Sequence, residues 1–394
     1  MMESSQTNSP SLALFCKVVD NFGDIGICWR LSRQLHSEHQ VHVHLWVDDL
    51  LSFQRICPEV DTALPQQSIK GIQIHHWNNQ DAHFSEEDIA DIVIEFFACD
   101  IPPAYIQAMA RRSEQPVWLN LEGLTAEEWV EGCHRLPSPH PSLSITKHFF
   151  FPGFTAKTGG LLVERDLELK RSTFLQDRDA ISAFWKNFGM KTDDSDATKI
   201  SLFCYPHAPV ADLFAVWESS SSKILCLIPE GVAREQVQAF AGRDLHAGER
   251  ATRGSLSLHV LPFVPQEQYD QLLWLCDLNF VRGEDSFVRA QWAGKPFIWH
   301  IYPQDENLHH KKLKAFLQRY ASDFPQLRTL SLAWNAALAE ETNWTDLWNH
   351  FQQERQKIET ETSAWTRSMR ENGDLCANLL SFTKEVRQKR QNLG

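Results

Sequence analysis

The sequence predicts an α/β protein of two domains, each with a parallel sheet, followed by long helices towards the C-terminal end. Short apolar runs alternate with stretches of helical periodicity through both halves of the chain. In each half, one strand–helix junction combines glycine with acidic side chains. The length of 394 residues exceeds what one compact core normally serves, so two domains are expected.

Composition narrows the class of protein. Hydrophobic residues make up 43% and charged residues 23%, values typical of a globular protein. The net charge of −13 argues against a general nucleic-acid binder, because phosphate contacts need a basic face. Nine scattered cysteines without a CxxC pair predict neither a zinc site nor a disulfide framework. No apolar run reaches membrane-spanning length, so we expect a cytoplasmic, reduced protein without a membrane or nucleic-acid partner.

The first half reads as alternating strands and helices. The expected strands are 12–19, 41–47, 72–77, 89–98 and 116–121, and the expected helices follow at 48–56, 102–109 and 124–136. Thr125 and Glu128 have capping-box spacing, which predicts the start of the last of these helices. Four strand histidines, at positions 42, 44, 75 and 76, lack a supporting carboxylate or cysteine, so we interpret them as solvent-facing or hydrogen-bonded rather than metal-binding. An aromatic loop is expected at 148–158.

The first polar elbow, with the sequence VVDNFGDIG, follows the first predicted strand. Asp20 lies at the end of the strand and Asp24 near the start of the next helix. Gly23 and Gly26 allow the backbone to turn and a ligand to approach closely. The pattern is neither GxGxxG nor a Walker loop, and a capped tight turn is an equally good interpretation.

The second half repeats the alternation. The expected strands are 199–204, 224–228, 256–261, 278–281 and 297–299, with helices at 179–188, 210–217, 233–241, 267–276 and 308–321 and long helical stretches at 344–372 and 375–389. We place the domains at 1–175 and 176–360, with a polar linker at 191–198. The C-terminal helices of 361–394 are expected to pack back towards the first domain.

The second polar elbow lies in DLNFVRGEDSFVRAQWAGKPFIWH, which reads as strand, elbow, helix and strand. Unpaired amides at a helix start suit an anion, and Ser286 is among the first helical residues. The simpler interpretation is an N-cap made by Asp285 and Ser286, but Arg282 and Glu284 crowd the same turn.

Other polar and aromatic residues should lie at the same edge of this sheet. Tyr205, Phe263 and Gln266 each come just after a predicted strand, and carboxyl ends of parallel strands share one edge. An aromatic ring there could stack a base, although each residue alone is more often a packing residue.

These elbows together indicate group transfer from an activated nucleotide. We expect the two domains to face each other across a cleft, with carboxylates on one side and an anion-holding elbow on the other. Helix-start amides, Arg282 and Ser286 can stabilise a departing diphosphate without a metal. Asp20 can act as general base on the acceptor or orient it.

Three long blocks, in order along the chain, resemble one family. They are VVDNFGDIGICWRL, FFFPGFTAKTGGLL and LPFVPQEQYDQLLWLCDLNFVRGEDSFVRAQWAGKPFIWHIYPQ, and they are similar to the EarP protein-arginine rhamnosyltransferases. The resemblance implies a GT-B fold of two Rossmann-like domains. It also implies inverting, metal-independent transfer of L-rhamnose from dTDP-β-L-rhamnose to a guanidinium nitrogen of one arginine in elongation factor P, which activates that factor for ribosomes stalled at polyproline.

The resemblance assigns roles to individual residues. The implied catalytic carboxylates are Asp20, Asp24 and Glu284. The implied donor-binding residues are Phe22, Gly23, Tyr205, Phe263, Gln266, Arg282, Asp285 and Ser286. No metal or cofactor is implied. For the docking of the acceptor protein we expect the aromatic loop 148–158 and the surface near Asp24.

Two other functions fit the residues. One is a GT-B glycosyltransferase that acts on a small molecule or a glycan, which would accept substrates other than a folded protein. The other is a non-catalytic nucleotide-sugar-binding regulator, in which Asp20→Asn would leave function intact.

Overall fold

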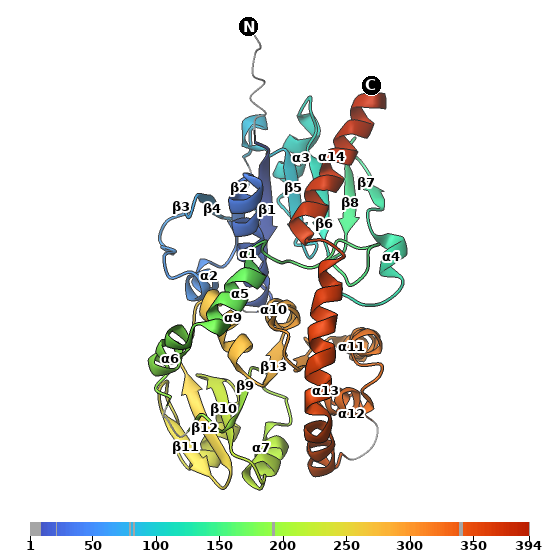
Figure 1. Cartoon of the computed structure of the whole chain (residues 1–394). Coiled ribbons are helices and arrows are strands. Elements are labelled where there is room, and N and C mark those ends of the chain that lie inside the picture. Colours follow the sequence, from blue (N-terminus) through green and yellow to red (C-terminus); the bar gives the residue numbers. More distant parts are fainter. Residues whose placement is uncertain are drawn as a thin grey trace. The chain divides into compact units, whose positions relative to one another are not determined.

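A computed structural model describes residues 9–20, 22–78, 80–81, 83–190, 194–338 and 342–393 (Figure 1). Asn21 of the first elbow and residues 191–193 of the expected linker lie outside this part of the chain. The chain forms two compact units: unit 1 comprises Met1–Arg165 and Met369–Gly394, and unit 2 comprises Asp166–Ser368. Each unit has its own sheet with flanking helices, which confirms the α/β prediction.

Unit 1 contains an eight-stranded sheet in the order β3-β4-β2-β1-β5-β6-β8-β7. Its strands are β1 Ser11–Cys16, β2 His42–Val47, β3 Gln66–Ile69, β4 Ile72–His76, β5 Ile92–Phe96, β6 Val117–Leu121, β7 Pro137–Pro139 and β8 Thr146–Phe150. The six inner strands are parallel, and β3 and β7 are short antiparallel edges. Neither edge strand is predicted from the sequence, because both are short and lack a buried apolar run.

Helices cover both faces of this sheet. They are α1 Gly23–His39, α2 Leu50–Ile56, the 3₁₀ turn η1 Glu86–Asp88, α3 Pro103–Arg111, α4 Val130–Cys133 and α14 Leu375–Leu393. Ala13, Phe15 and Val93 form a core with Tyr105 and Met109 of α3. Because side chains alternate along a strand, the residues between them face the opposite side, where α1 and α14 pack.

The C-terminal segment completes unit 1. Leu375 N–H donates to Leu161 O at 3.0 Å, beside a β-bridge between Leu161 and Asp374. The amide of Gln34, in the buried face of α1, donates to Val163 O at 2.8 Å. Asn378 donates to Gly159 O at 3.1 Å. Unit 1 is therefore assembled from two segments separated by the whole of unit 2.

Unit 2 contains a six-stranded sheet in the order β11-β12-β10-β9-β13-β14. Its strands are β9 Thr198–Leu202, β10 Ile224–Pro229, β11 Arg250–Arg253, β12 Leu256–Leu261, β13 Leu278–Arg282 and β14 Phe297–His300. Its helices are α5 Leu167–Gln176, α6 Arg178–Asn187, α7 Val210–Glu218, α8 Arg234–Ala241, α9 Gln266–Leu275, α10 Asp285–Ala293, α11 Leu308–Tyr320, α12 Pro325–Trp334 and most of α13 Trp344–Arg370, with the 3₁₀ turn η3 Asp305–Asn307. All strands except β11 are parallel.

The limits of unit 2 differ from the expected limits of 176 and 360. Helix α5 belongs to unit 2, where Arg171 of this helix donates to Ala293 O at 3.1 Å. At the other end, Thr366 Oγ1 donates to Gln291 O at 2.6 Å and Trp365 Nε1 donates to the side chain of Gln291. Side-chain bonds that the sequence pattern does not reveal thus join α5 and the C-terminal part of α13 to α10.

Two local predictions were wrong. The helix expected at 124–136 is reduced to Val130–Cys133, because the Thr125 hydroxyl accepts from the amide of Glu127 in a local turn instead of closing a capping box. The aromatic loop begins later than expected, since β8 runs to Phe150. Among the helices that the structure describes, none is both long and apolar enough to cross a bilayer.

Candidate active site

Each polar elbow lies at the topological switch point of its own sheet. In unit 1 the chain leaves β1 towards β2 on one side and later returns to β5 on the other side. In unit 2 it leaves β9 towards β10 and returns to β13. Loops that diverge at such a point leave a crevice outside the carboxyl ends of the strands, where open α/β sheets bind ligands.

Arg282, at the end of β13, lies against the segment that follows β9. Its guanidinium stands 4.3 Å from the ring centre of Phe203 and 4.9 Å from that of Tyr205. The same guanidinium donates to Cys204 O at 3.2 Å. The charge is thus oriented by two rings and a carbonyl, with no carboxylate in this set of contacts, so it remains suitable for an anion.

The start of α10 is built around Ser286. The Arg282 amide donates to Ser286 Oγ at 3.1 Å, and the hydroxyl donates in turn to Arg282 O. Gly283 has φ of 63°, a conformation that other residues rarely adopt, and its carbonyl accepts from Trp299 Nε1 at 2.7 Å. Glu284 occupies the N-cap position without a side-chain cap bond. The simpler interpretation, an N-cap made by Asp285 and Ser286, is therefore wrong, since Ser286 Oγ bonds back to Arg282 and both residues lie inside the helix.

The start of α9 lies beside this turn. Gln266 Nε2 donates to Asp285 Oδ2 at 3.3 Å, so the first residues of α9 and α10 are in contact. Phe263, in the preceding loop, keeps 50% of its surface exposed. A buried ion pair supports the arrangement: Arg289 binds Asp270 through two bonds of 3.0 and 2.7 Å.

His300 was not among the predicted site residues. It ends β14 in register with Arg282, and its Nδ1 accepts from the Tyr205 amide at 3.2 Å. Burial, and then His207 and Arg282, lower the pKa of His300 to about 3, so its imidazole is neutral at physiological pH. Its Nε2 lies 3.0 Å from Nε2 of His207. The position after a predicted strand could have identified it, by the argument that identified Tyr205.

Asp24 fixes the elbow of unit 1. One of its carboxylate oxygens accepts from the amides of Val19 and Asp20, at 2.7 and 2.8 Å. The side chain is buried, and burial is the main reason that its pKa is raised, with Asp20 and Asp48 adding to the effect and the two amide bonds opposing it. Asp24 therefore acts on the backbone that carries Asp20.

The carboxylate of Asp20 lies over the first residue of α1. The backbone carbonyl of Asp20 accepts from the Gly23 amide at 2.7 Å, and Oδ2 of Asp20 would stand 3.0 Å from a Cβ atom added at Gly23. Phe22 is the N-cap residue of the helix. A carboxylate at a helix start is favoured by the helix dipole, and glycine at position 23 leaves the space it occupies.

The turn after β5 is the second loop at this switch point. Phe97, Ala98 and Asp100 have φ of 53°, 51° and 54°, which is costly for residues with a side chain. The buried side chain of Asn120 accepts from the Ala98 amide at 3.0 Å and holds the turn in place. The sequence does not predict this turn, because none of these residues with positive φ is glycine.

The structure thus brings the predicted residues together in two sets. The elbow of unit 1 carries Asp20, Phe22, Gly23 and Asp24. The switch point of unit 2 is surrounded by Tyr205, Gln266, Arg282, Asp285 and Ser286. Glu284 lies in the turn before α10 and Phe263 in the loop before α9.

The histidines and the aromatic loop do not join these sets. His44 and His75 bond to each other at 3.1 Å, as expected of hydrogen-bonded strand histidines. Within the described ranges no group of three or more His, Cys, Asp or Glu is arranged to hold a metal ion. Phe150 and Phe151 are buried in unit 1 beside Phe382 and Trp129, so these rings are not available to an acceptor.

Comparison with known proteins identifies the family. The model of the elongation factor P rhamnosyltransferase family, EarP, matches residues 12–384. The chain belongs to the EarP family. A protein-arginine rhamnosyltransferase of Pseudomonas putida is 47% identical over 350 residues, which are 86% of this chain and 92% of the relative. One of Pseudomonas aeruginosa is 42% identical over 377 residues, 94% and 97% of the two chains.

Solved structures agree with this assignment. A structure described as the basis for EarP-mediated arginine glycosylation of translation elongation factor EF-P is 30% identical, with a TM-score of 0.67, and covers 96% of this chain and 99% of its own. A UDP-GlcNAc 2-epimerase of Neisseria meningitidis has a TM-score of 0.50 at 9% identity over 94% of this chain and 98% of its own, a likeness of fold alone. The EarP chain is a glycosyltransferase of the GT-B type with two Rossmann-like units.

Proposed function

We propose that this EarP chain transfers L-rhamnose from dTDP-β-L-rhamnose to a guanidinium nitrogen of one arginine of elongation factor P, with inversion and without a metal. The match to the EarP family from residue 12 to 384 carries this proposal. The modification would activate the factor for ribosomes stalled at polyproline. The dTDP-rhamnose donor, the acceptor and the stereochemistry are all parts of the proposal.

Unit 2 is proposed to hold the donor. The thymidine base would stack on Phe263, which is half exposed, with Tyr205 and Gln266 beside it. The diphosphate would lie at the start of α10, where backbone amides, Ser286 and the guanidinium of Arg282 supply positive charge. These groups can stabilise the departing dTDP in the way that a divalent metal does in other transferases.

Unit 1 is proposed to supply the base. Asp20 removes one proton from a guanidinium nitrogen while that nitrogen forms a bond to the anomeric carbon of rhamnose. The bond from that carbon to the diphosphate oxygen breaks, and its electron pair leaves with dTDP. The guanidinium loses a proton and gains a glycosyl group, so its charge is unchanged. Attack opposite to the leaving group inverts the anomeric configuration.

Asp24 and Glu284 are assigned supporting roles. Asp24 is buried and bonded to the amides of Val19 and Asp20, so it positions the elbow rather than the acceptor. Glu284 is the N-cap residue of α10, within the proposed diphosphate-binding turn, and is assigned the alignment of the cationic acceptor as a second carboxylate.

The test is the intact mass of elongation factor P after incubation with the protein, dTDP-L-rhamnose and EDTA. We expect a gain of one deoxyhexose on a single arginine, and Asp20→Asn should abolish most of this gain while donor binding, measured by calorimetry, stays normal. A wild-type rate in Asp20→Asn would remove Asp20 from the mechanism. Transfer only with added magnesium would refute metal independence, and no gain under either condition, with donor bound, would refute the acceptor.

A further inference from the structure

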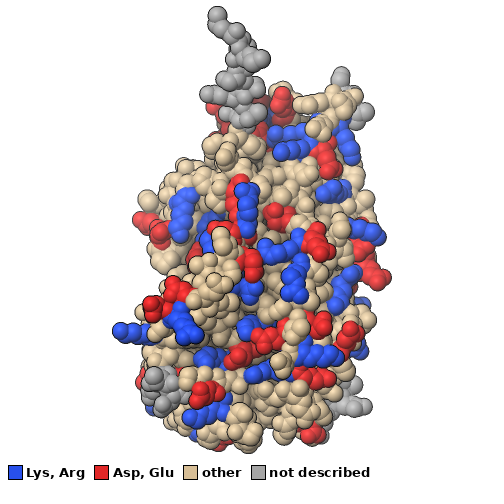
Figure 2. Space-filling view, viewed as in Figure 1, with Lys and Arg blue, Asp and Glu red and all other residues tan. Residues whose placement is uncertain are grey.

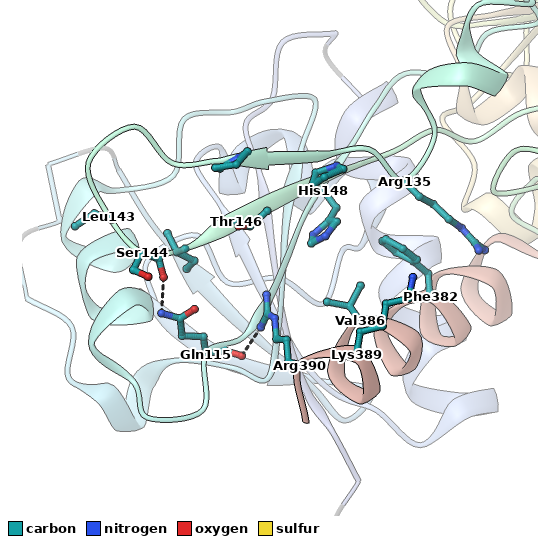
Figure 3. A pocket seen from close by; sticks show the side chains of 13 residues that line it. Gln115, Arg135, Leu143, Ser144, Thr146, His148, Phe382, Val386, Lys389 and Arg390 are labelled. Atoms are coloured by element: carbon teal, nitrogen blue, oxygen red, sulfur yellow. Dashed lines mark hydrogen bonds between the residues drawn. The ribbon is translucent and has the colours of Figure 1, made fainter. Parts of the chain in front are cut away.

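Unit 1 contains a pocket of about 580 Å³ between β8, β7 and α14 (Figure 3). Its volume lies within the range of about 300–1,000 Å³ that is usual for small-molecule sites. Phe382 and Val386 of α14 form an apolar wall, and the ring of His148 of β8 packs edge-on against Phe382, with 5.5 Å between the ring centres. Lys389 and Arg390 also line the pocket, and none of the described lining residues carries a carboxylate.

The pocket is remote from the elbow of unit 1. Its lining includes Thr146, which begins β8, and Gln115, which precedes β6, so it opens at the amino edge of these strands. Asp20 follows the carboxyl end of β1, a strand parallel to both through β5. The pocket therefore belongs to neither of the two residue sets described above.

The cations around the pocket fall into two classes. Arg135 pairs with Glu385 at 3.6 Å, and Arg387, on the same helix, lies 3.8 Å from Asp91. Arg390 instead donates to the carbonyls of Gln115 and Pro116, at 2.9 and 3.1 Å. Among the described residues neither Lys389 nor Arg390 forms an ion pair with a carboxylate. In the described part of the chain, these two cations thus have no paired carboxylate.

Neighbouring groups respond to this positive charge. Burial, followed by Arg390 and Lys389, lowers the pKa of His148. Burial and then Arg387 lower the pKa of Arg390. A backbone hydrogen bond at Trp118 opposes these effects on His148.

Basic residues in the last turn of a helix often do no more than complement the helix dipole. That explanation covers Arg390 but not Lys389, which precedes the last turn of α14, nor His148, which lies on a strand. It also does not explain a cavity of this size. On the face shown in Figure 2, basic and acidic side chains are interspersed, whereas the lining of the pocket combines basic residues with no carboxylate.

We propose that this pocket binds a small organic phosphate. The phosphoryl group would lie between Lys389, Arg390 and His148, and the apolar part of the ligand against Phe382 and Val386. A phosphate monoester carries nearly two negative charges at neutral pH, which matches the two cations better than a carboxylate does. The proposal concerns a second site and does not depend on the rhamnosyl-transfer mechanism.

Phenyl phosphate is the probe, titrated into the full-length protein by isothermal calorimetry. We expect saturable binding with a Kd of the order of 1 mM or tighter. Lys389→Glu should weaken it by about tenfold or more, because a charge-assisted contact becomes a repulsion. The matched control is Lys384→Glu, an exposed lysine of the same helix that does not line the pocket. This variant should bind like the wild type.

Several results would overturn the proposal. These are equal weakening in both lysine variants, or equal binding of neutral phenol. Inorganic phosphate that binds as tightly as phenyl phosphate would refute the role of the apolar wall. Thermal melting of both variants verifies that each is folded, so that a lost signal reports on binding.

Discussion

Replacing Gly23 by alanine tests whether the position of the Asp20 carboxylate limits transfer. The new Cβ would stand 3.0 Å from Asp20 Oδ2, so the carboxylate must move by a few tenths of an ångström. A displacement of about 1 Å at a reacting group can cost roughly 100-fold in rate. On a logarithmic scale the smaller shift corresponds to a roughly fourfold to tenfold fall in kcat.

The stability of this variant should change in the opposite direction. Gly23 is the first residue of α1, and alanine in a helix is favoured over glycine by up to about 1 kcal/mol. We therefore expect a slower enzyme with an equal or higher melting temperature, measured by single-turnover transfer and calorimetry. Gly132→Ala is the control, because an added Cβ in α4 meets nothing within 4 Å. Unchanged kcat in Gly23→Ala, or the same fall in Gly132→Ala, would refute the reasoning.

Two further predictions concern unit 2. Arg289→Met removes both bonds to the buried Asp270 and should lower the free energy of unfolding by about 3–5 kcal/mol, or the melting temperature by roughly 6–20 °C. The double variant Arg289→Met/Asp270→Leu should recover much of this stability. A loss below about 1 kcal/mol in the single variant would contradict the assignment. His300→Asn tests acid stability. The pKa of His300 in the folded protein, about 3, lies below the ordinary value of 6.5, so the unfolded chain takes up the proton first as the pH falls. The free energy of unfolding therefore decreases as the pH falls through this range. Between pH 7.5 and 5 the wild type should lose about 2 kcal/mol of stability through this histidine, and His300→Asn should not show this loss. The control His350→Asn, at an exposed position, should melt like the wild type at each pH. Equal losses in the wild type and His300→Asn would contradict this prediction.

The sequence predicted those parts of the fold that depend on local patterns. The apolar runs of β5 and β12 are buried strands, and the glycine-bearing elbows stand at strand ends. The parallel arrangement placed Tyr205 and Arg282 at one edge, and their contact confirms that inference. Short edge strands such as β7 depend on a neighbouring strand for their conformation, so their own residues carry little signal.

Long-range contacts explain most of what was missed. His300 joins the site through a bond to the Tyr205 amide, and the turn after β5 is held by Asn120 of β6, whose side chain accepts from an amide 22 residues earlier in the chain. Neither hydrogen bond follows from the helical or strand periodicity of the sequence. The pocket beside α14 is lined by residues of β8 and of the C-terminal segment together, and no local motif predicts that these segments meet.

The discontinuous build of unit 1 has a consequence for biosynthesis. Helix α14 and Asp374 leave the ribosome only after residues 166–368, which form unit 2 from one uninterrupted segment. Unit 2 can therefore fold while the faces of α1 and β6 that receive α14 are still uncovered. Until then the nascent chain would expose apolar surface of unit 1, which makes this stage the one at which a chaperone is most needed.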